Sequence, residues 1–85
     1  MSRFKISIAA DRAGEYSRKV AKETDAEIDT PSGDIVRGHF LGLSYGEILA
    51  LPRMRNLRLR IEENSYRLLS LEDTGAFIAV KERED

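Results

Sequence analysis

The sequence predicts a single α+β domain in which an N-terminal strand and helix pack on a strongly curled antiparallel sheet. Three observations support this fold class. Phe4, Ile6 and Ile8 alternate with polar residues at the start of the chain, the same two-residue period returns in its second half, and turn-forming residues separate the periodic stretches. A chain of 85 residues can fill only one hydrophobic core, so we expect one domain over residues 1–85.

The first two elements are expected to be a strand followed by a helix. The alternation of apolar and polar residues places the strand at about residues 3–9. Asp11 can then accept hydrogen bonds from the free N–H groups of a first helical turn, which predicts a helix over residues 12–23. Its apolar positions recur at helical spacing and are Ala13, Tyr16, Val20 and Ala21.

A hairpin is expected next. Residues 30–33, Thr-Pro-Ser-Gly, have the composition of a type I turn, because proline fixes φ at the second position and glycine is favoured at the fourth. The turn would join a strand at residues 26–30 to one at residues 34–40. Gly38 and Gly42 would weaken that second strand unless they mark bulges or bends, so we expect the sheet to curl strongly there.

Residues 43–51 allow two interpretations. Ser44 and Glu47 have the spacing of a capping box, which favours a short helix. Gly46 is unfavourable inside a helix, and Tyr45-Gly46 is also a plausible hairpin tip followed by a strand at residues 48–51. The curled-sheet fold is based on the strand interpretation.

The C-terminal half is predicted to be a meander. Leucine and isoleucine alternate with arginine over residues 57–61, which indicates a strand with one buried face. Asn64-Ser65 is expected to turn the chain into a strand at residues 66–71, and residues 73–75 into a strand at residues 76–80. The expected core contributors are Met54, Leu57, Leu59, Ile61, Leu69, Leu71, Phe77 and Val80.

Charge is segregated along the chain, although the formal net charge is only -1. Residues 1–24 carry six Lys or Arg against three acids, and residues 25–51 carry one arginine against five acids. Residues 52–61 carry four arginines and no acid, whereas residues 62–85 carry three Lys or Arg against seven acids. Alternating blocks of this kind can form complementary faces on neighbouring copies of one chain, or a site for a polyanion.

The arginine-rich stretch is the best candidate binding site in the sequence. On an amphipathic strand Arg58 and Arg60 face solvent because the leucines face the core, whereas Arg53 and Arg55 precede the strand and can add to the same face. Cations on the outer face of the expected helix would extend this surface. The candidate residues for binding an anion or a partner are therefore Arg53, Arg55, Arg58, Arg60, Arg18, Lys19 and Lys22.

Motifs for catalysis, metal binding or a cofactor do not emerge from the sequence. His39 is the sole histidine and cysteine is absent, so thiolate metal sites and disulfides are excluded. Residues 33–38 lack the lysine of a phosphate-binding loop. We expect no enzyme activity, no cofactor, no metal and no small-molecule substrate. The chain contains no apolar run long enough to span a bilayer, and the missing cysteines suggest a cytoplasmic protein.

These observations favour a non-enzymatic protein-interaction or self-assembly module, with a protein partner or a homo-oligomer as the expected association. The alternative is a protein that binds nucleic-acid backbone through residues 53–60. Such binding needs several cations along a groove, and single-strand binders add aromatic side chains on which bases stack. Aromatic residues make up only 7% of this chain, which favours the protein partner.

Residues 26–51, AEIDTPSGDIVRGHFLGLSYGEILAL, resemble the first motif of Sm-like proteins. In that family a strand and turn lead to a glycine, a second glycine follows five positions later, and a strongly bent strand continues into a third. Gly33 and Gly38 have this spacing here, and residues 40–43 continue the pattern. Residues 66–80 are similar to the last two strands of many SH3-like small barrels. The resemblance covers about half of the chain and implies a curled five-stranded unit.

The residues that bind RNA in Sm-like proteins are not matched. An aspartate and an asparagine of that family correspond to Ser44 and Ile48 here, and Glu72 and Asp73 stand where its second motif has an arginine-glycine pair. The resemblance therefore implies a fold and no RNA site.

The alternative fold is a β-α-β-β-α-β sandwich similar to phosphocarrier proteins of the HPr type. This layout requires the helical interpretation of residues 44–51. The phosphorylated histidine of that family would lie at the start of the first helix, and residues 11–15 contain none. The chemistry of that family would therefore be missing.

Overall fold

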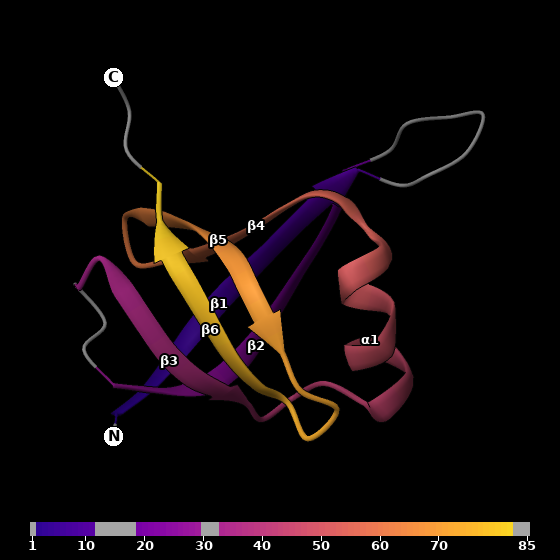
Figure 1. Cartoon of the computed structure of the whole chain (residues 1–85), viewed down its shortest axis with the longest axis horizontal. Coiled ribbons are helices and arrows are strands. Elements are labelled where there is room, and N and C mark those ends of the chain that lie inside the picture. The colour runs from indigo at the N-terminus through magenta and orange to yellow at the C-terminus, as the bar shows by residue number, and fades with distance from the viewer. Residues whose placement is uncertain (1, 12–18, 30–32, 83–85) are drawn as a thin grey trace.

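The computed structural model describes residues 2–11, 19–29 and 33–82, with residues 19 and 20 described by their backbone alone. These residues form six strands, one α-helix and one 3-10 helix (Figure 1). The elements are β1 (Ser2–Asp11), β2 (Lys19–Asp29), β3 (Ile35–Phe40), α1 (Tyr45–Ala50), η1 (Leu51–Arg53), β4 (Arg55–Ile61), β5 (Asn64–Leu71) and β6 (Ala76–Lys81).

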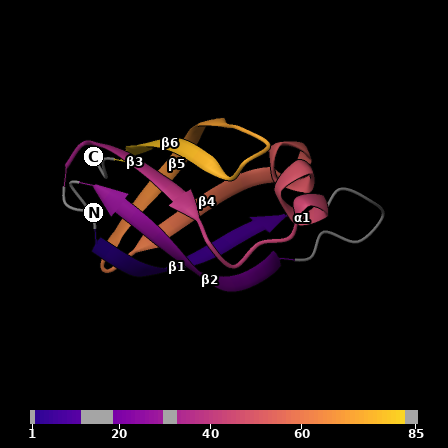
Figure 2. The ribbon, with the colours of Figure 1, turned by 90° about the horizontal axis from the view of Figure 1, so that it is seen from below.

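The strands form a small closed antiparallel barrel in the order β1-β2-β3-β6-β5-β4. Strands β1 to β3 make one meander and β4 to β6 a second one, and the pairs β1·β4 and β3·β6 join the two. The helix α1 lies at one end of the barrel, between the layer of β1 and β2 and the layer of β5 and β6 (Figure 2). The connection from the first meander to the second runs through α1 and η1.

The barrel interior is filled by side chains that alternate along each strand with outward-facing ones. Ile6 and Ile8 of β1, for example, lie opposite Ile61 and Leu59 of β4, and all four are buried. Among the predicted core residues, Leu57, Leu59, Ile61 and Phe77 are buried, while Met54 and Leu71 are partly buried and pack against the core. Phe77 stacks on Phe40 with ring centroids 4.4 Å apart, which ties β6 to β3.

Two predicted core residues face outward. Leu69 is 53% exposed because β5 contains a bulge at this position: Leu68 pairs with Ala79 and Ser70 with Ile78, so Leu69 has no partner of its own. Val80 is half-buried and lies between residues of β3 and β5 that both face solvent, so it belongs to the outer surface of the barrel.

The predicted helix over residues 12–23 is wrong for its second half. Residues 19–23 belong to β2, which pairs with β1 from Ser2↔Ile28 to Asp11↔Lys19, and residues 12–18 lie outside the described residues. Long-range pairing outweighs local helical spacing here, because every residue of β1 gains a cross-strand neighbour. The predicted hairpin between residues 26–30 and 34–40 is confirmed in its strands, since β2 pairs with β3.

The strand interpretation of residues 48–51 is also wrong. Residues 45–50 form the helix α1, and the capping box is complete: Glu47 N–H donates to Ser44 Oγ at 3.2 Å, and Ser44 N–H donates to Glu47 Oε1 at 3.0 Å. Both hydrogen bonds satisfy first-turn donors that a short helix leaves free. The barrel nevertheless forms, because β1 and β2 are longer than the strands predicted at residues 3–9 and 26–30 and pair with each other from Ser2↔Ile28 to Asp11↔Lys19. The element order also differs from the β-α-β-β-α-β alternative.

Among the described residues Tyr66 is the largest side chain with no exposed surface, and it anchors β5 to the start of β3. Its hydroxyl donates to the Gly33 carbonyl oxygen at 3.1 Å. Burial raises the pKa of Tyr66 above its ordinary value, and the negative charges of Asp34 and Glu62 raise it further. The hydroxyl therefore remains a protonated donor, as the bond to Gly33 requires.

Candidate functional site

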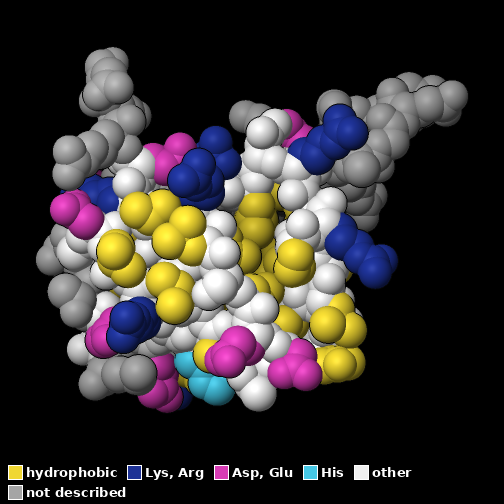
Figure 3. All heavy atoms as spheres, in the orientation of Figure 1, with side chains coloured by type: hydrophobic (Ala, Val, Ile, Leu, Met, Phe, Trp, Pro, Cys, Tyr) yellow, Lys and Arg dark blue, Asp and Glu magenta, His cyan; other side chains and the backbone are white. Residues whose placement is uncertain are grey.

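A groove of about 590 Å³ lies between β4 and β5. It occupies the hollow near the middle of Figure 3, where hydrophobic side chains are seen below the surrounding surface. Seven of its eleven lining residues are apolar, and none of those that the structure describes is acidic. The lining residues are Leu51, Pro52, Met54, Asn56, Leu57, Arg58, Arg67, Leu68, Leu69, Ser70 and Leu71.

The groove exists because β4 and β5 pair over only part of their length. Their pairing runs from Ile61↔Asn64 to Leu59↔Tyr66 and ends there. Each strand contains a bulge beyond that point. In β4 one extra residue lies between Arg58, opposite Ala9, and Arg55, opposite Asp11. A bulge bends its strand and increases its twist, so two facing bulges separate the strands.

Asn56 adopts the positive φ that the bulge in β4 requires. Its φ is 54°, a left-handed conformation that asparagine tolerates better than most residues. The Asn56 side chain donates to Asp11 Oδ2 at 2.7 Å, which fixes this part of β4 to β1. Asn56 thus stabilises the bulge, and β4 remains attached to β1 on its other edge.

Two arginines lie at the groove. Arg58 Nη1 donates to the carbonyl oxygen of Leu57 at 3.1 Å, and its Nε forms an ion pair with Glu82. Arg67 is exposed and forms no ion pair with a residue that the structure describes. Since Glu82 compensates Arg58, the uncompensated positive charge at the rim of the groove is that of Arg67.

Of the predicted binding residues, Arg58 and Arg60 share the outer face of β4, as expected from their alternation with leucine. Arg60 is exposed and lies between Ser7 of β1 and Ser65 of β5. Arg55 is exposed beyond the bulge, opposite Asp11, and Arg53 is exposed at the end of η1. On the face shown in Figure 3 the Lys and Arg side chains lie apart from one another, with hydrophobic and acidic side chains between them.

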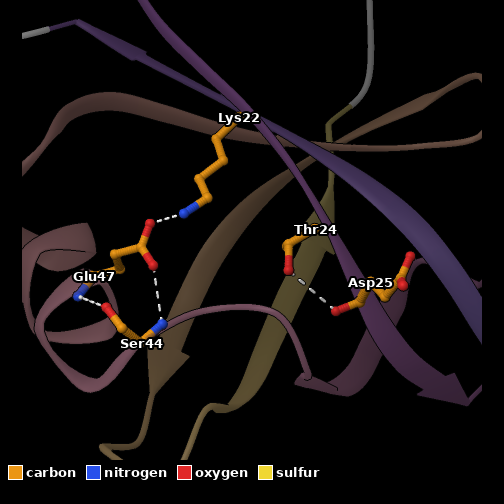
Figure 4. A network of polar contacts seen from close by, with 5 residues as sticks. All are labelled: Lys22, Thr24, Asp25, Ser44 and Glu47. Atoms are coloured by element: carbon orange, nitrogen blue, oxygen red, sulfur yellow. Dashed lines mark hydrogen bonds and ion pairs between the residues drawn. The ribbon is translucent and has the colours of Figure 1, made fainter.

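Lys22 is not brought to this arginine face. It lies opposite Ile8, whose side chain points into the barrel, so Lys22 is on the inner face of β2. From there it reaches the helix α1 and forms an ion pair with Glu47, the capping-box residue (Figure 4). Lys19 is placed by its backbone opposite Asp11, and Arg18 lies outside the described residues.

A second exposed apolar surface covers the outside of β3, β6 and β5, where hydrophobic side chains gather in Figure 3. Ile35 is 56% exposed and lies beside Val80 of β6. On its other side Val80 pairs with Arg67 of β5. We call Ile35, Ile78 and Val80 the outer patch. It is continuous with the groove through β5, so the groove and the outer patch flank the same strand.

The other chemistry-bearing residues form no catalytic arrangement in the described part of the chain. His39 is exposed, and its Nε2 lies 2.7 Å from the carbonyl oxygen of Thr74, across the turn between β5 and β6. Within residues 2–11, 19–29 and 33–82, no group of His, Asp and Glu side chains is arranged to hold a metal ion. No helix in those segments has the length and apolar character to span a membrane.

Neither the family models, nor the curated proteins, nor the solved structures with which the chain was compared gave a match. The fold and the groove define the molecule only as a small six-stranded antiparallel barrel with a leucine-rich groove in one wall.

Sequence reasoning did not find the groove, although it selected Arg58 at its rim. The contribution of β5, above all Arg67 and Leu68, was missed because it depends on where the pairing of β4 with β5 ends. The one local signal was Asn56, since asparagine next to a strand often marks a positive φ.

Proposed function

We propose that the chain is a non-enzymatic protein-interaction module whose binding site is the groove between β4 and β5, and that it binds a protein partner or a second copy of itself. The observation that carries this proposal is the open wall of an otherwise closed barrel. A volume of about 590 Å³, lined by leucine and methionine with a few polar groups, is within the size range of binding pockets. An unpaired strand edge beside apolar side chains is a surface that other protein segments recognise.

Two finer statements belong to the same proposal. The barrel is compatible with the SH3-like and Sm-like small barrels, and we propose that relationship on the strength of the strand order in its C-terminal meander. We also propose a cytoplasmic setting, which the absence of cysteine supports.

Binding of nucleic-acid backbone through residues 53–60 is the alternative. It rests on the exposed Arg53, Arg55 and Arg60. Arg58 contributes less to nucleic-acid binding because Glu82 already neutralises its charge. Lys22 lies on the inner face of β2 and so is not part of the arginine face. The groove favours the protein partner because it is rich in leucine and its lining offers no aromatic ring for base stacking.

Photo-crosslinking tests the proposal. A photoreactive phenylalanine analogue at position 69, which is exposed at the groove, should form covalent adducts with protein in the cells from which the gene derives. The matched control carries the analogue at position 35, because Ile35 and Leu69 are exposed to 56% and 53%. The mass of the adduct distinguishes a second copy of this chain from a different protein. Adducts from position 35 alone, or equal labelling at both positions, would contradict a site in the groove.

A further inference from the structure

The backbone of the groove walls carries hydrogen-bonding groups that no strand pairs. In an antiparallel ladder, successive residues direct their N–H and C=O alternately to one neighbour and to the other. Ile61 and Asn64 close the two-residue loop, so they bond to each other, and Leu59 bonds to Tyr66 in turn. By this alternation the carbonyl oxygen of Leu57 is directed toward β5, where the pairing has already ended.

The same alternation applies to the facing wall. Leu68 follows Tyr66 by two residues and directs its N–H and C=O toward β4. Beyond the bulge, Glu72 N–H donates to the Ala76 carbonyl oxygen at 2.8 Å, so Leu71 directs its backbone groups away from β6 and toward the groove. Two strand edges therefore face each other across the groove without bonding.

Arg58 shows that a backbone acceptor at the edge of β4 is bonded to a side chain and not to a strand. Its guanidinium group donates to the carbonyl oxygen of Leu57, its own neighbour in sequence. A backbone carbonyl in the middle of a strand ordinarily accepts from the next strand. The arginine occupies the position of a missing strand donor, and an incoming backbone N–H can take its place.

The side chains of the groove specify the chemistry of the incoming segment. Leu57 is buried at the floor, and Leu68 and Leu71 are half-buried along the wall. Apolar side chains on alternate positions of an extended segment would reach this floor, because successive side chains of a strand point to opposite faces. The intervening side chains would point outward to the rim, where Arg67 favours carboxylates and has no ion pair with a described residue, whereas Arg58 is already paired with Glu82.

We propose, as an extension of the proposed function, that the groove binds its partner by strand addition. The occupant is an extended segment in which apolar residues alternate with acidic ones. Its backbone completes the ladder at Leu57, Leu68 and Leu71, its apolar side chains cover the leucines, and a carboxylate pairs with Arg67.

The experiment uses a blocked peptide of alternating aspartate and leucine, about six residues long, titrated into the isotopically labelled full chain and followed by NMR. We expect it to bind more tightly than about 1 mM and to shift the amide signals of Leu57, Leu68 and Leu71. The matched peptide with lysine in place of aspartate should bind at least about tenfold more weakly. Equal binding of the two peptides would overturn the acidic preference, and no binding of the aspartate peptide would overturn the inference.

Backbone methylation separates strand addition from side-chain docking. Two further versions of the aspartate peptide carry N-methyl groups on one or the other set of alternate residues, which removes hydrogen-bond donors and leaves the side chains unchanged. At least one version should lose about tenfold in affinity. If both bind as well as the parent, strand addition is wrong, whereas the groove remains a protein-binding site. Crosslinking at position 69 without binding of the aspartate peptide would likewise overturn this inference alone.

Charge-reversal substitutions in the protein provide a second test of the inference. Arg67→Glu should exchange the preference, so that the lysine peptide binds better than the aspartate peptide. Arg60→Glu is the control, because Arg60 is also exposed on an outer strand face but does not line the groove. An equal effect of both variants would mean that the overall charge of the protein decides binding, and would overturn the role of the rim.

Discussion

Leu59→Ala is expected to lower the free energy of unfolding by about 2–5 kcal/mol, because it removes methyl groups from a fully enclosed site. Leu59 has no exposed surface and lies between Ile8 of β1 and Tyr66 of β5, so three strands meet at its side chain. The cavity can collapse only partly, since closed strand pairing surrounds it on both sides. Urea denaturation monitored by circular dichroism measures the change.

The matched control is Leu69→Ala. Leu69 is the same residue type and is 53% exposed at the bulge of β5, so we expect a change within about 0.5 kcal/mol. If both substitutions cost the same, the buried and exposed sides of the second meander have been assigned incorrectly.

Gly38→Ala should also destabilise the barrel, by about 1–3 kcal/mol, because the position has no room for a methyl group. A Cβ built on Gly38 would lie 2.6 Å from the Phe77 ring and 2.8 Å from the backbone oxygen of Glu27. The ring is held by its stack on Phe40, and the oxygen belongs to the neighbouring strand, so neither can yield cheaply. Thermal unfolding measures the loss.

Gly46→Ala provides a control of opposite sign. Apart from its chain neighbours and the backbone of α1 itself, no described atom lies within 4 Å of a Cβ at this position, and alanine is favoured over glycine in helices. We expect the variant to be as stable as the wild type or more stable, by up to about 1 kcal/mol. A loss at Gly46 comparable with that at Gly38 would show that the close packing against Phe77 is not the cause.

The part of the fold that could be predicted from sequence is the part in which strong hydrophobic residues alternate. The strand through Leu57, Leu59 and Ile61 is an example, and the strand at residues 76–80 is another. In β2 the inward residues include Thr24 and Ala26, which carry little apolar signal, so the helical spacing of residues further upstream dominated the prediction.

Two other errors have specific physical causes. The hairpin between β4 and β5 turns at Glu62-Glu63 instead of Asn64-Ser65, with Glu62 at a φ of 55°. Glutamate rarely occupies this conformation, so the sequence contains no turn signal there. The inward prediction for Leu69 assumed an uninterrupted period of two, which a bulge shifts by one residue.

Of the candidate site, only a positively charged residue at the rim could be predicted from the sequence. Arg58 was selected because it lies on the solvent side of an amphipathic strand, and that position is confirmed. The groove beside it arises from the end of strand pairing and from two bulges. Both depend on how segments that are distant in the sequence pair with each other, and neither is marked by a characteristic amino-acid composition.

Amide hydrogen exchange of the free protein tests the central claim most directly, since it reports which backbone groups of the groove walls are bonded. The open wall predicts that the amides of Leu68 and Leu71 exchange at least about tenfold faster than those of Leu59 and Tyr66, which lie in the paired part of the same two strands. Addition of the aspartate peptide should slow the exchange of Leu68 and Leu71. Protection of these two amides equal to that of Leu59 in the free protein would show that the wall is already bonded, and would contradict the binding groove.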